Sequence, residues 1–363
     1  MRGTRGEARD ERRETRQAGR ADLVISPFPL VSRLSSLVSP FSSLVSRLSS
    51  LAVLVALVAC STGALERVPI PPGSTVRAAA ESLAAHGVIR SPAWFRLRAR
   101  LAHTDRTVKA GIYQFARGSS TGTVLRRLKA GDAVRFRITL PSGGTLFDLA
   151  RSAHATLNIP SDSIVAAGSD SAVLQRFELP GPSVEGWLLP ESFDFGGFDA
   201  ARDVIARFVT ARQQAWDSTW DARAAAQHLD RKALISLASI VAAEAKDPAE
   251  QPMIAAVYRN RLKQHMPLQA DPTIQYAWLL RTGSRKGRLY NGDYLLDSPW
   301  NSYRHPGLPP GPIGNPSREA IEAVLNPARM SYLYFVAGPD GKSLFATTYA
   351  EHRRNITRVR GDE

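Results

Sequence analysis

Helix-start signals in close succession constrain the middle of this chain more than any other feature. Residues 231–246 carry apolar side chains at helical spacing. Asp247-Pro248-Ala249-Glu250 has the pattern of a capping box with proline at the first helical position, so it predicts a second helix that runs to about Lys263. Asp271-Pro272 repeats the start signal for a third helix. The sequence therefore predicts a central helical segment around which the rest of the domain packs.

One carboxylate in this segment, that of Glu244, lies at a position where an apolar side chain is expected. Leu237, Ile240 and Val241 lie seven, four and three residues before Glu244. At 3.6 residues per turn these residues share a helix face, which places Glu244 on the apolar stripe. A carboxyl group that loses water there should have a raised pKa, as a general acid needs near neutral pH. The alternative is a glutamate at the helix end that pairs with Arg259 or Arg261.

Patterns on both sides of this segment mix strands and helices. Residues 66–140 are predicted to form a small module with strands at 68–70, 110–116 and 134–140 and helices at about 75–86, 92–103 and 122–130. A Pro/Gly/Ser break at 141–144 separates the module from a larger domain over residues 145–360. That domain has helices at 145–155, near 199–227 and at 317–325, a polar stretch at 160–183, and a hairpin in YLYFVAGPDGKSLFATT (332–348). The predicted fold class is α+β.

The first sixty residues have a different character. Residues 1–47 are a low-complexity extension, with an Arg/Glu-rich start followed by Ser-rich repeats of period seven, and we expect disorder at their start. Residues 48–60 are uncharged and strongly apolar, with arginines upstream, which is typical of an export signal or membrane anchor. Leu57-Val58-Ala59-Cys60 also resembles a bacterial lipobox. Both interpretations place residues 61–363 outside the cytoplasm and beside a membrane.

Charge and cysteine content narrow the classes of function. The net charge of +14 favours a polyanionic partner, such as nucleic acid, anionic lipid or an acidic wall polymer. An export signal argues against nucleic acid. A single cysteine excludes an intrachain disulfide, and the seven histidines include no HExxH pair, so we predict neither a metal site nor a cofactor. Gly118–Gly122 matches the nucleophile pattern G-x-S-x-G, but its Ser/Thr/Gly composition is that of an ordinary capped loop.

Long blocks of sequence resemble the endolytic murein transglycosylase (MltG/YceG-like) family. The strongest is LASIVAAEAKDPAEQPMIAAVYRNRLKQHMPLQADPTIQYA at 237–277. Further blocks follow the family order: EGWLLPESF (185–193), SPWNSY (298–303), GLPPGPIGNP (307–316) and YLYFVAGPDGKSLFATTYAEH (332–352). Residues 66–140 resemble the LysM-like module of that family. The resemblance covers nearly all of residues 66–360.

The resemblance implies an enzyme that cuts nascent peptidoglycan glycan strands internally without water and leaves 1,6-anhydro-muramic acid ends. It implies that Glu244 is the catalytic acid and base. Substrate contacts are expected from residues in the matching blocks: Asn260, Arg261, Gln269, Asp271, Thr273, Asn301 and Tyr303. The resemblance also implies anchorage in the cytoplasmic (inner) membrane, a catalytic domain on the outer side of that membrane, and peptidoglycan synthases as candidate partners.

Two departures from the family pattern leave alternatives open. The family often carries a second acid two residues before the catalytic glutamate, where this chain has Ala242. A residue at that spacing is expected to point away from the face of Glu244. The family's Pro-Asp-Thr block is Pro190-Glu191-Ser192 here. A hydrolytic muramidase would need a second carboxylate, for which Glu185 and Glu191 are candidates. A silent peptidoglycan-binding scaffold is the other alternative.

Overall fold

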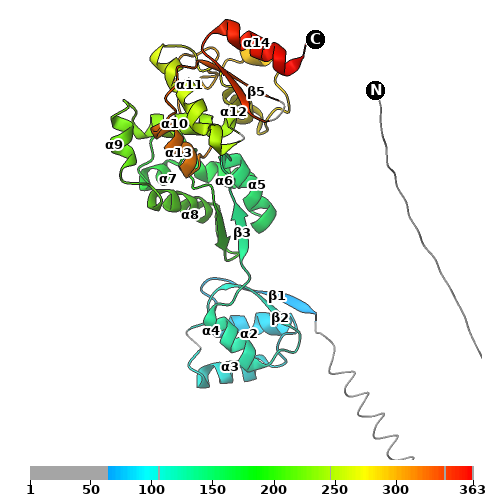
Figure 1. The fold of residues 1–363 in the computed structure, drawn as a ribbon. Helices are drawn as coiled ribbons and strands as arrows, with labels where there is room; N and C mark the ends of the chain where they lie inside the picture. The colour runs from blue at the N-terminus through cyan, green and yellow to red at the C-terminus, as the bar shows by residue number, and fades with distance from the viewer. Residues whose placement is uncertain (1–63, 105–106, 246, 339–340, 362–363) are drawn as a thin grey trace, which may run out of the picture. The chain divides into compact units, whose positions relative to one another are not determined.

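A computed structural model describes residues 64–361, apart from 105–106, 246 and 339–340. Its first part is a small module with its own hydrophobic core. Strands β1 (Leu65–Ile70) and β2 (Gly111–Ala116) pair antiparallel (Figure 1). Helices α2 (Val76–Ala85), α3 (Pro92–Leu101) and α4 (Thr121–Ala130) complete the module. Phe95, Tyr113 and Leu128 are among the side chains buried between these elements.

Helix caps set the helix boundaries in this module. The side chains of Thr75, Ser91 and Ser120 each accept a hydrogen bond from the backbone N–H three residues later. Each bond satisfies a donor that has no partner inside the helix. The starts predicted at Thr75 and at Ser91-Pro92 are confirmed.

A second core forms around a short antiparallel pair, β3 (Phe136–Thr139) and β4 (Ser192–Phe195). The strand predicted at 134–140 therefore makes its ladder with residues from the larger region. Four helices bury their apolar sides in this core: α5 (Leu146–Leu157), α6 (Ser161–Gly168), α7 (Ser171–Arg176) and α8 (Ala201–Gln214). The polar stretch 160–183 thus contains two helices, because Ile164 and Val173 are buried and Asp170 caps the second.

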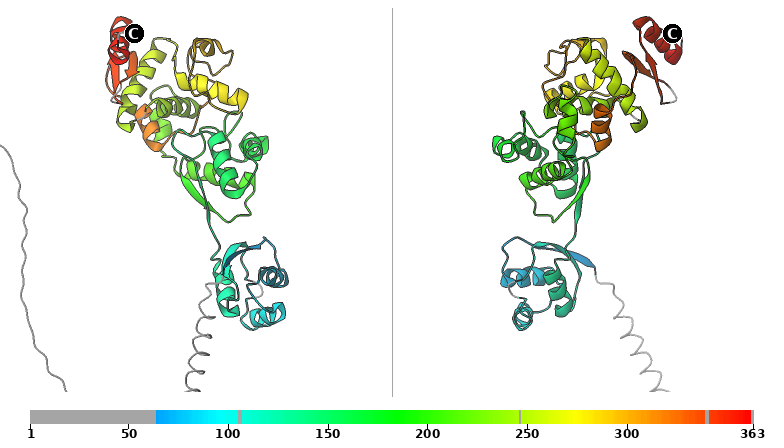
Figure 2. Two further views of the ribbon diagram at one scale, coloured as in Figure 1. Left: turned by 90° about the vertical axis from the view of Figure 1, so that its right-hand side faces the viewer. Right: turned by 60° about the vertical axis from the view of Figure 1, so that its left-hand side comes forward.

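The third core is built around α10 (Arg231–Glu244), whose residues 234–241 are all buried. Helices α9 (Trp220–Ala225), α11 (Gln251–Lys263), α12 (Asp271–Thr282) and α13 (Arg318–Leu325) belong to the same region (Figures 1 and 2). The single helix predicted near 199–227 is divided into α8 and α9. Asp217 accepts hydrogen bonds from the N–H and hydroxyl of Thr219, and this turn interrupts the helix.

The predicted capping box at 247–250 forms only in part. Asp247 accepts from the Ala249 N–H and starts a short 3₁₀ helix, η1 (Pro248–Glu250), before α11. The Glu250 carboxylate does not accept from the backbone N–H of the cap residue, as the second bond of a capping box would require. It accepts instead from the N–H and the hydroxyl of Ser343, both at 2.7 Å. Ser343 begins β6 (Ser343–Ala346), which pairs antiparallel with β5 (Tyr334–Ala337) as the predicted hairpin. The buried carboxylate therefore ties the hairpin to α11.

Helix α14 (Tyr349–Arg360) follows the hairpin, and a 3₁₀ helix η2 (Asn291–Leu295) lies in the turn-rich stretch after α12. The combination of helices with short antiparallel strands confirms the α+β class. Among the described residues, no helix has the length and hydropathy to cross a membrane. The anchor predicted at 48–60 and the extension at 1–47 lie outside the described residues.

Gly186 is a position that only glycine can fill without strain. Its φ is +84°, and a Cβ there would lie 2.4 Å from Pro312 Cγ and 2.6 Å from Ile235 Cγ2. We expect Gly186→Ala to destabilise the fold by about 3 kcal/mol, since it combines an unfavourable φ with overpacking. Urea unfolding would measure the loss. Gly287→Ala is the matched control, because no atom lies within 4 Å of that Cβ and its φ is ordinary; equal stability of the two variants would contradict the prediction.

Candidate active site

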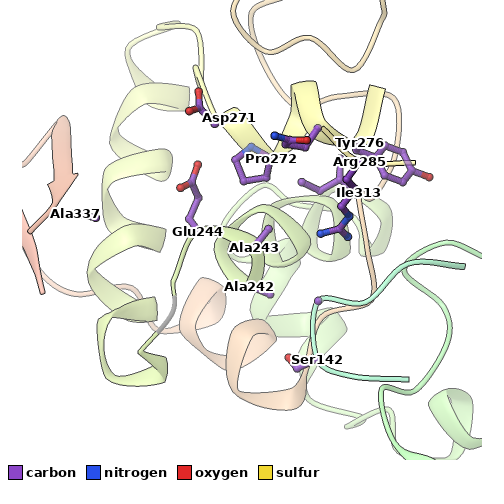
Figure 3. A pocket seen from close by; sticks show the side chains of 12 residues that line it. Ser142, Ala242, Ala243, Glu244, Asp271, Pro272, Tyr276, Arg285, Ile313 and Ala337 are labelled. Carbon is purple, nitrogen blue, oxygen red and sulfur yellow. The ribbon is translucent and has the colours of Figure 1, made fainter. Parts of the chain in front are cut away.

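The C-terminal end of α10 opens into a cleft of about 480 Å³. Figure 3 shows Glu244 and Asp271 on one side of the view and Tyr276 and Arg285 on the other. The cleft is lined by the end of α10, the start of α12, the loop at 142–143 and single residues from more distant segments: Ser142, Gly143, Ala242, Ala243, Glu244, Asp271, Pro272, Gln275, Tyr276, Arg285, Ile313 and Ala337.

Two loops hold one wall of this cleft in place. The Gly143 N–H donates to the Asn315 carbonyl and the Asn315 N–H donates to the Gly144 carbonyl, both at 2.8 Å. Their close approach requires glycine at 314, where a Cβ would lie 2.6 Å from the Gly143 carbonyl oxygen. The Pro/Gly/Ser break predicted between two domains thus contributes to the wall of the candidate site.

Glu244 is the last residue of α10 and is partly buried in the cleft wall. The Tyr258 hydroxyl, on α11, donates to Glu244 Oε1 at 3.0 Å. Burial raises the pKa of Glu244 to about 7, and the negative charge of Asp271 acts in the same direction. The hydrogen bond from Tyr258 and the charge of Arg261 oppose the rise. The raised pKa expected from the apolar stripe is confirmed, and a position at a helix C-terminus further disfavours negative charge.

Asp271 is the first residue of α12, so it lies at a helix N-terminus, whereas Glu244 lies at a helix C-terminus. A helix N-terminus stabilises negative charge. The Tyr303 hydroxyl donates to Asp271 Oδ1 at 2.6 Å, and the Tyr294 hydroxyl donates to Oδ2 at 3.4 Å. Burial and the contact with Asp271 raise the pKa of Tyr303, so it remains a donor. The cleft therefore presents two carboxyl groups at contrasting positions, Glu244 at a helix C-terminus and Asp271 at a helix N-terminus.

Asn260 and Arg261 direct their side chains into the protein. The Asn260 amide donates to the carbonyls of Met330 and Tyr332 at 2.9 and 3.0 Å. Arg261 is buried and donates to the carbonyls of Leu333 and Leu268, both at 2.7 Å. These bonds fix the segment before β5 against α11. Arg261 also contributes positive charge at Glu244.

Three further residues proposed for substrate binding make hydrogen bonds with backbone groups: Gln269 and Thr273 at the turn between α11 and α12, and Asn301 at the end of η2. Thr273 is buried, and its hydroxyl donates to the Ala270 carbonyl at 2.7 Å. Asn301 is buried and donates to the carbonyls of Tyr294 and Leu296 at 3.0 and 2.8 Å. Gln269 has a φ of +50°, and its N–H donates to the Ser302 carbonyl. Of the seven residues, only Asp271 lines the cleft, and Tyr303 is its direct partner.

The two glutamates considered for a second catalytic carboxylate lie elsewhere. Glu185 is buried, accepts from the Leu146 N–H at 3.1 Å and from Asn315 Nδ2 at 2.7 Å, and has a pKa raised by burial to about 7. These bonds join α5 to the loop at 315. Glu191 is exposed at the start of β4. Neither glutamate is among the residues that line the cleft, whereas the Asp271 carboxyl group is.

Ala242 was expected to point away from the face of Glu244, and it nevertheless belongs to the wall of the cleft. Ala242, Ala243 and Glu244 all line the cleft, because the helix ends there and its last turn is open on more than one side. Sequence reasoning also missed Tyr258, which bonds Glu244 from fourteen residues away, and Gln275, Tyr276 and Arg285 in the cleft wall. Gln275 follows Asp271 by four residues, a helical spacing that could have indicated it.

A second, polar hollow of about 660 Å³ adjoins the cleft. Asp271 and Gln275 line both spaces, and Arg288, Asn291 and Tyr294 lie in the wall of the second. Together the two hollows form an extended groove with Asp271 between them. A groove with arginines at 285 and 288 suits a long ligand that carries negative charge.

Two carboxyl groups, those of Glu244 and Asp271, lie in one cleft, an arrangement typical of enzymes that use acid–base catalysis. The YceG-like family profile matches residues 68–358, and the chain belongs to this family.

Named relatives and a solved structure agree with this assignment. An endolytic murein transglycosylase from Bacillus subtilis (strain 168) is 29% identical over 302 residues, which cover 79% of this chain and 82% of the relative. An enzyme of the same name from Streptococcus pneumoniae serotype 2 is 27% identical over 80% of this chain and 57% of its own length. The crystal structure of a YceG-like protein from Listeria monocytogenes is similar with a TM-score of 0.56 and 27% identity, over 80% of this chain and 98% of that one.

Proposed function

We propose that this protein is a lytic transglycosylase, a lyase that cleaves peptidoglycan glycan strands at internal bonds. The two named relatives are endolytic murein transglycosylases. The observation that carries the proposal is the environment of Glu244, a carboxyl group with a pKa near 7 in an open cleft. An acid with that pKa is about half protonated at neutral pH, so it can donate a proton and then act as a base.

The reaction needs only one proton shuttle. Protonated Glu244 gives its proton to the O4 leaving group of the β-1,4 bond between N-acetylmuramic acid and N-acetylglucosamine. The C1–O4 bond breaks, and the muramic sugar develops oxocarbenium character. The Glu244 carboxylate then takes the proton of the C6 hydroxyl, whose oxygen closes onto C1. The products are a 1,6-anhydro-muramic end and a free 4-hydroxyl, and no water is consumed.

Asp271 supports both stages of this reaction. Its negative charge favours the protonated form of Glu244 before cleavage. The same charge stabilises positive charge that develops on the sugar, as a preorganised group in a cleft can. Tyr303 holds the carboxylate in place through its 2.6 Å hydrogen bond.

The extended groove suits internal cleavage. Two adjoining hollows around Asp271 accommodate sugars on both sides of the bond to be cut. Arg285 and Arg288 carry charge that complements the lactyl and peptide carboxylates of the polymer.

The second carboxylate in the cleft favours one competing function, a hydrolytic muramidase, because Asp271 could activate water. Mass spectrometry of digested peptidoglycan decides between them. Anhydro-muramic ends support the lyase, and reducing ends from the same digest would refute it.

Residues 48–60 supply the anchor in the cytoplasmic membrane in this proposal, with the enzyme on the extracytoplasmic side. The uncharged, apolar character of that stretch supports this location. Residues 66–140 are the LysM-like module in this proposal, and the shared core of β1, β2 and three helices supports a separate module there. Peptidoglycan synthases are the proposed protein partners, since strand cutting acts on their product.

Tyr258→Phe should move the high-pH limb of the activity profile upward. The Tyr258 hydroxyl donates to the charged form of Glu244 and so lowers its pKa. Without that bond the pKa rises above 7, and Glu244 stays protonated to higher pH. We expect a shift of about one pH unit in kcat/KM. Tyr349→Phe, at an exposed tyrosine, is the control. A limb that stays fixed or moves to lower pH would contradict the assignment of Glu244 as the acid.

A further inference from the structure

Helix α3 of the small module exposes an apolar stripe to solvent. Trp94 is 53% exposed, Leu97 48% and Leu101 68%. Their spacing of three and four residues puts them on one face of the helix. The opposite face buries Phe95 and Ala99 in the module core. Helix α3 therefore has two apolar faces. One is buried in the module core, and the other is exposed and has no partner among the described residues.

Basic side chains flank this stripe. Helix α3 contains Arg96, Arg98 and Arg100 and no acidic residue. The Arg98 guanidinium lies 5.9 Å from the centre of the Trp94 ring. Arg126 and Lys129 of α4 line a shallow hollow together with Arg98, so the positive surface continues from α3 onto α4. In Figures 1 and 2, α3 lies on the side of the module away from the β1–β2 sheet.

We propose that this face of the module, formed by Trp94, Leu97 and Leu101 with Arg98 and Arg100, docks onto an anionic lipid surface. Tryptophan and leucine insert at the level of the headgroups, where the indole meets both the apolar and the wet layer. Arginines bury their aliphatic stems and direct the guanidinium to phosphate. Helix α3 has no amide or carboxylate side chain to accept hydrogen bonds from sugar hydroxyls, which favours lipid over a glycan.

Chain length supports the same occupant. The proposal rests on the membrane attachment through residues 48–60 put forward above. Only residues 61–64 separate that stretch from the start of β1 at Leu65. Four residues span at most about 15 Å, so an anchored chain keeps the module close to the lipid headgroups. At that distance the local concentration of lipid is high, and weak docking through three side chains is sufficient to orient the module.

Fluorescence quenching by lipid tests the docking directly. The full-length chain would be mixed with vesicles of phosphatidylcholine, with or without phosphatidylglycerol, that contain brominated lipid. The fluorescence of Trp94 is the part of the signal that is lost in Trp94→Phe. We expect brominated lipid to quench this part, and only in vesicles that contain phosphatidylglycerol. Arg98→Glu with Arg100→Glu should weaken that quenching more than tenfold in lipid titrations, because each basic residue near an anionic leaflet contributes about fivefold.

A matched charge change separates docking from general electrostatics. Arg353 and Arg354 are exposed on α14, so Arg353→Glu with Arg354→Glu alters the net charge equally at a place outside the small module. Equal loss of quenching in both double variants would overturn the proposal. The proposal would also be overturned if Trp94 were not quenched in a chain that sediments with anionic vesicles. That result would remove the docking of α3 and leave the proposed anchor intact. Quenching relieved by soluble glycan strands would overturn it in favour of a glycan site. Strand cleavage in solution, measured on the same variants, reports the proposed enzymatic function separately.

Discussion

Glu244→Gln is expected to lower strand cleavage by about 10⁴-fold, because the amide can neither give the proton to the leaving oxygen nor accept the proton from the C6 hydroxyl. The variant should still fold and bind, since the Gln side-chain oxygen can accept the 3.0 Å hydrogen bond from Tyr258. Mass spectrometry of peptidoglycan digests, with anhydro ends counted against time, measures the loss.

The stability of the same variant gives an independent check. The pKa of Glu244 is about 7 in the folded chain against 4.5 as its ordinary value. Between those values the unfolded chain releases the proton and the folded chain keeps it, so the stability of the native protein falls as pH rises from 4.5 to 7. Gln has no proton to lose. We therefore expect Glu244→Gln to gain up to about 3 kcal/mol over the native chain across that window.

Two results would contradict this account of Glu244. Retained cleavage would remove it from the chemistry. A stability difference that does not change with pH would mean that its carboxyl group is not held in its neutral form. Glu191→Gln is the control for both measurements, because Glu191 is exposed and outside the residues that line the cleft.

The sequence could predict Glu244 because its signal is local. The apolar residues that bury it lie within seven positions on the same helix, and helical spacing alone places them. The helix starts at Thr75, Ser91 and Asp271 were predictable for the same reason, since caps and prolines act within one turn. The polar stretch 160–183 was not assigned helices, because its polar composition did not indicate two short helices. These helices are stabilised by the burial of Ile164 and Val173 and by the cap at Asp170.

Contacts between residues far apart in the sequence determine the roles of several polar side chains that the sequence did not predict. Glu250 has the spacing of a capping box, yet its carboxylate bonds Ser343, ninety-three residues later. Asn301 and Thr273 belong to polar blocks that resemble a substrate site, yet both side chains bond backbone carbonyls: Thr273 bonds Ala270, beside Asp271, and Asn301 bonds Leu296 at the end of η2. No periodicity in the sequence separates a polar side chain that supports a site from one that faces the substrate.

Asp271→Asn tests the second carboxylate and should shift the pH profile in the direction opposite to Tyr258→Phe. The negative charge of Asp271 raises the pKa of Glu244, so its removal lowers that pKa and moves the high-pH limb to lower pH. The sugar also loses a charge that stabilises its cationic character. We expect kcat to fall about a hundredfold. Asp297→Asn is the control, since the Asp297 side chain is 92% exposed.

The products of Asp271→Asn then distinguish its role as a fixed charge from a role in activating water. If Asp271 only stabilises charge, the remaining products keep anhydro ends, because Glu244 still carries both proton transfers. If Asp271 were a base for water, the native enzyme would release reducing ends and the variant would lose them selectively. The 2.6 Å bond from Tyr303 favours the first outcome, since it occupies Oδ1, one of the two oxygens that would accept a proton from water. Tyr303→Phe frees that oxygen without removing the charge, and an increase in reducing ends in this variant would show that the hydrogen bond, as well as the geometry of the C6 hydroxyl, keeps water out of the reaction.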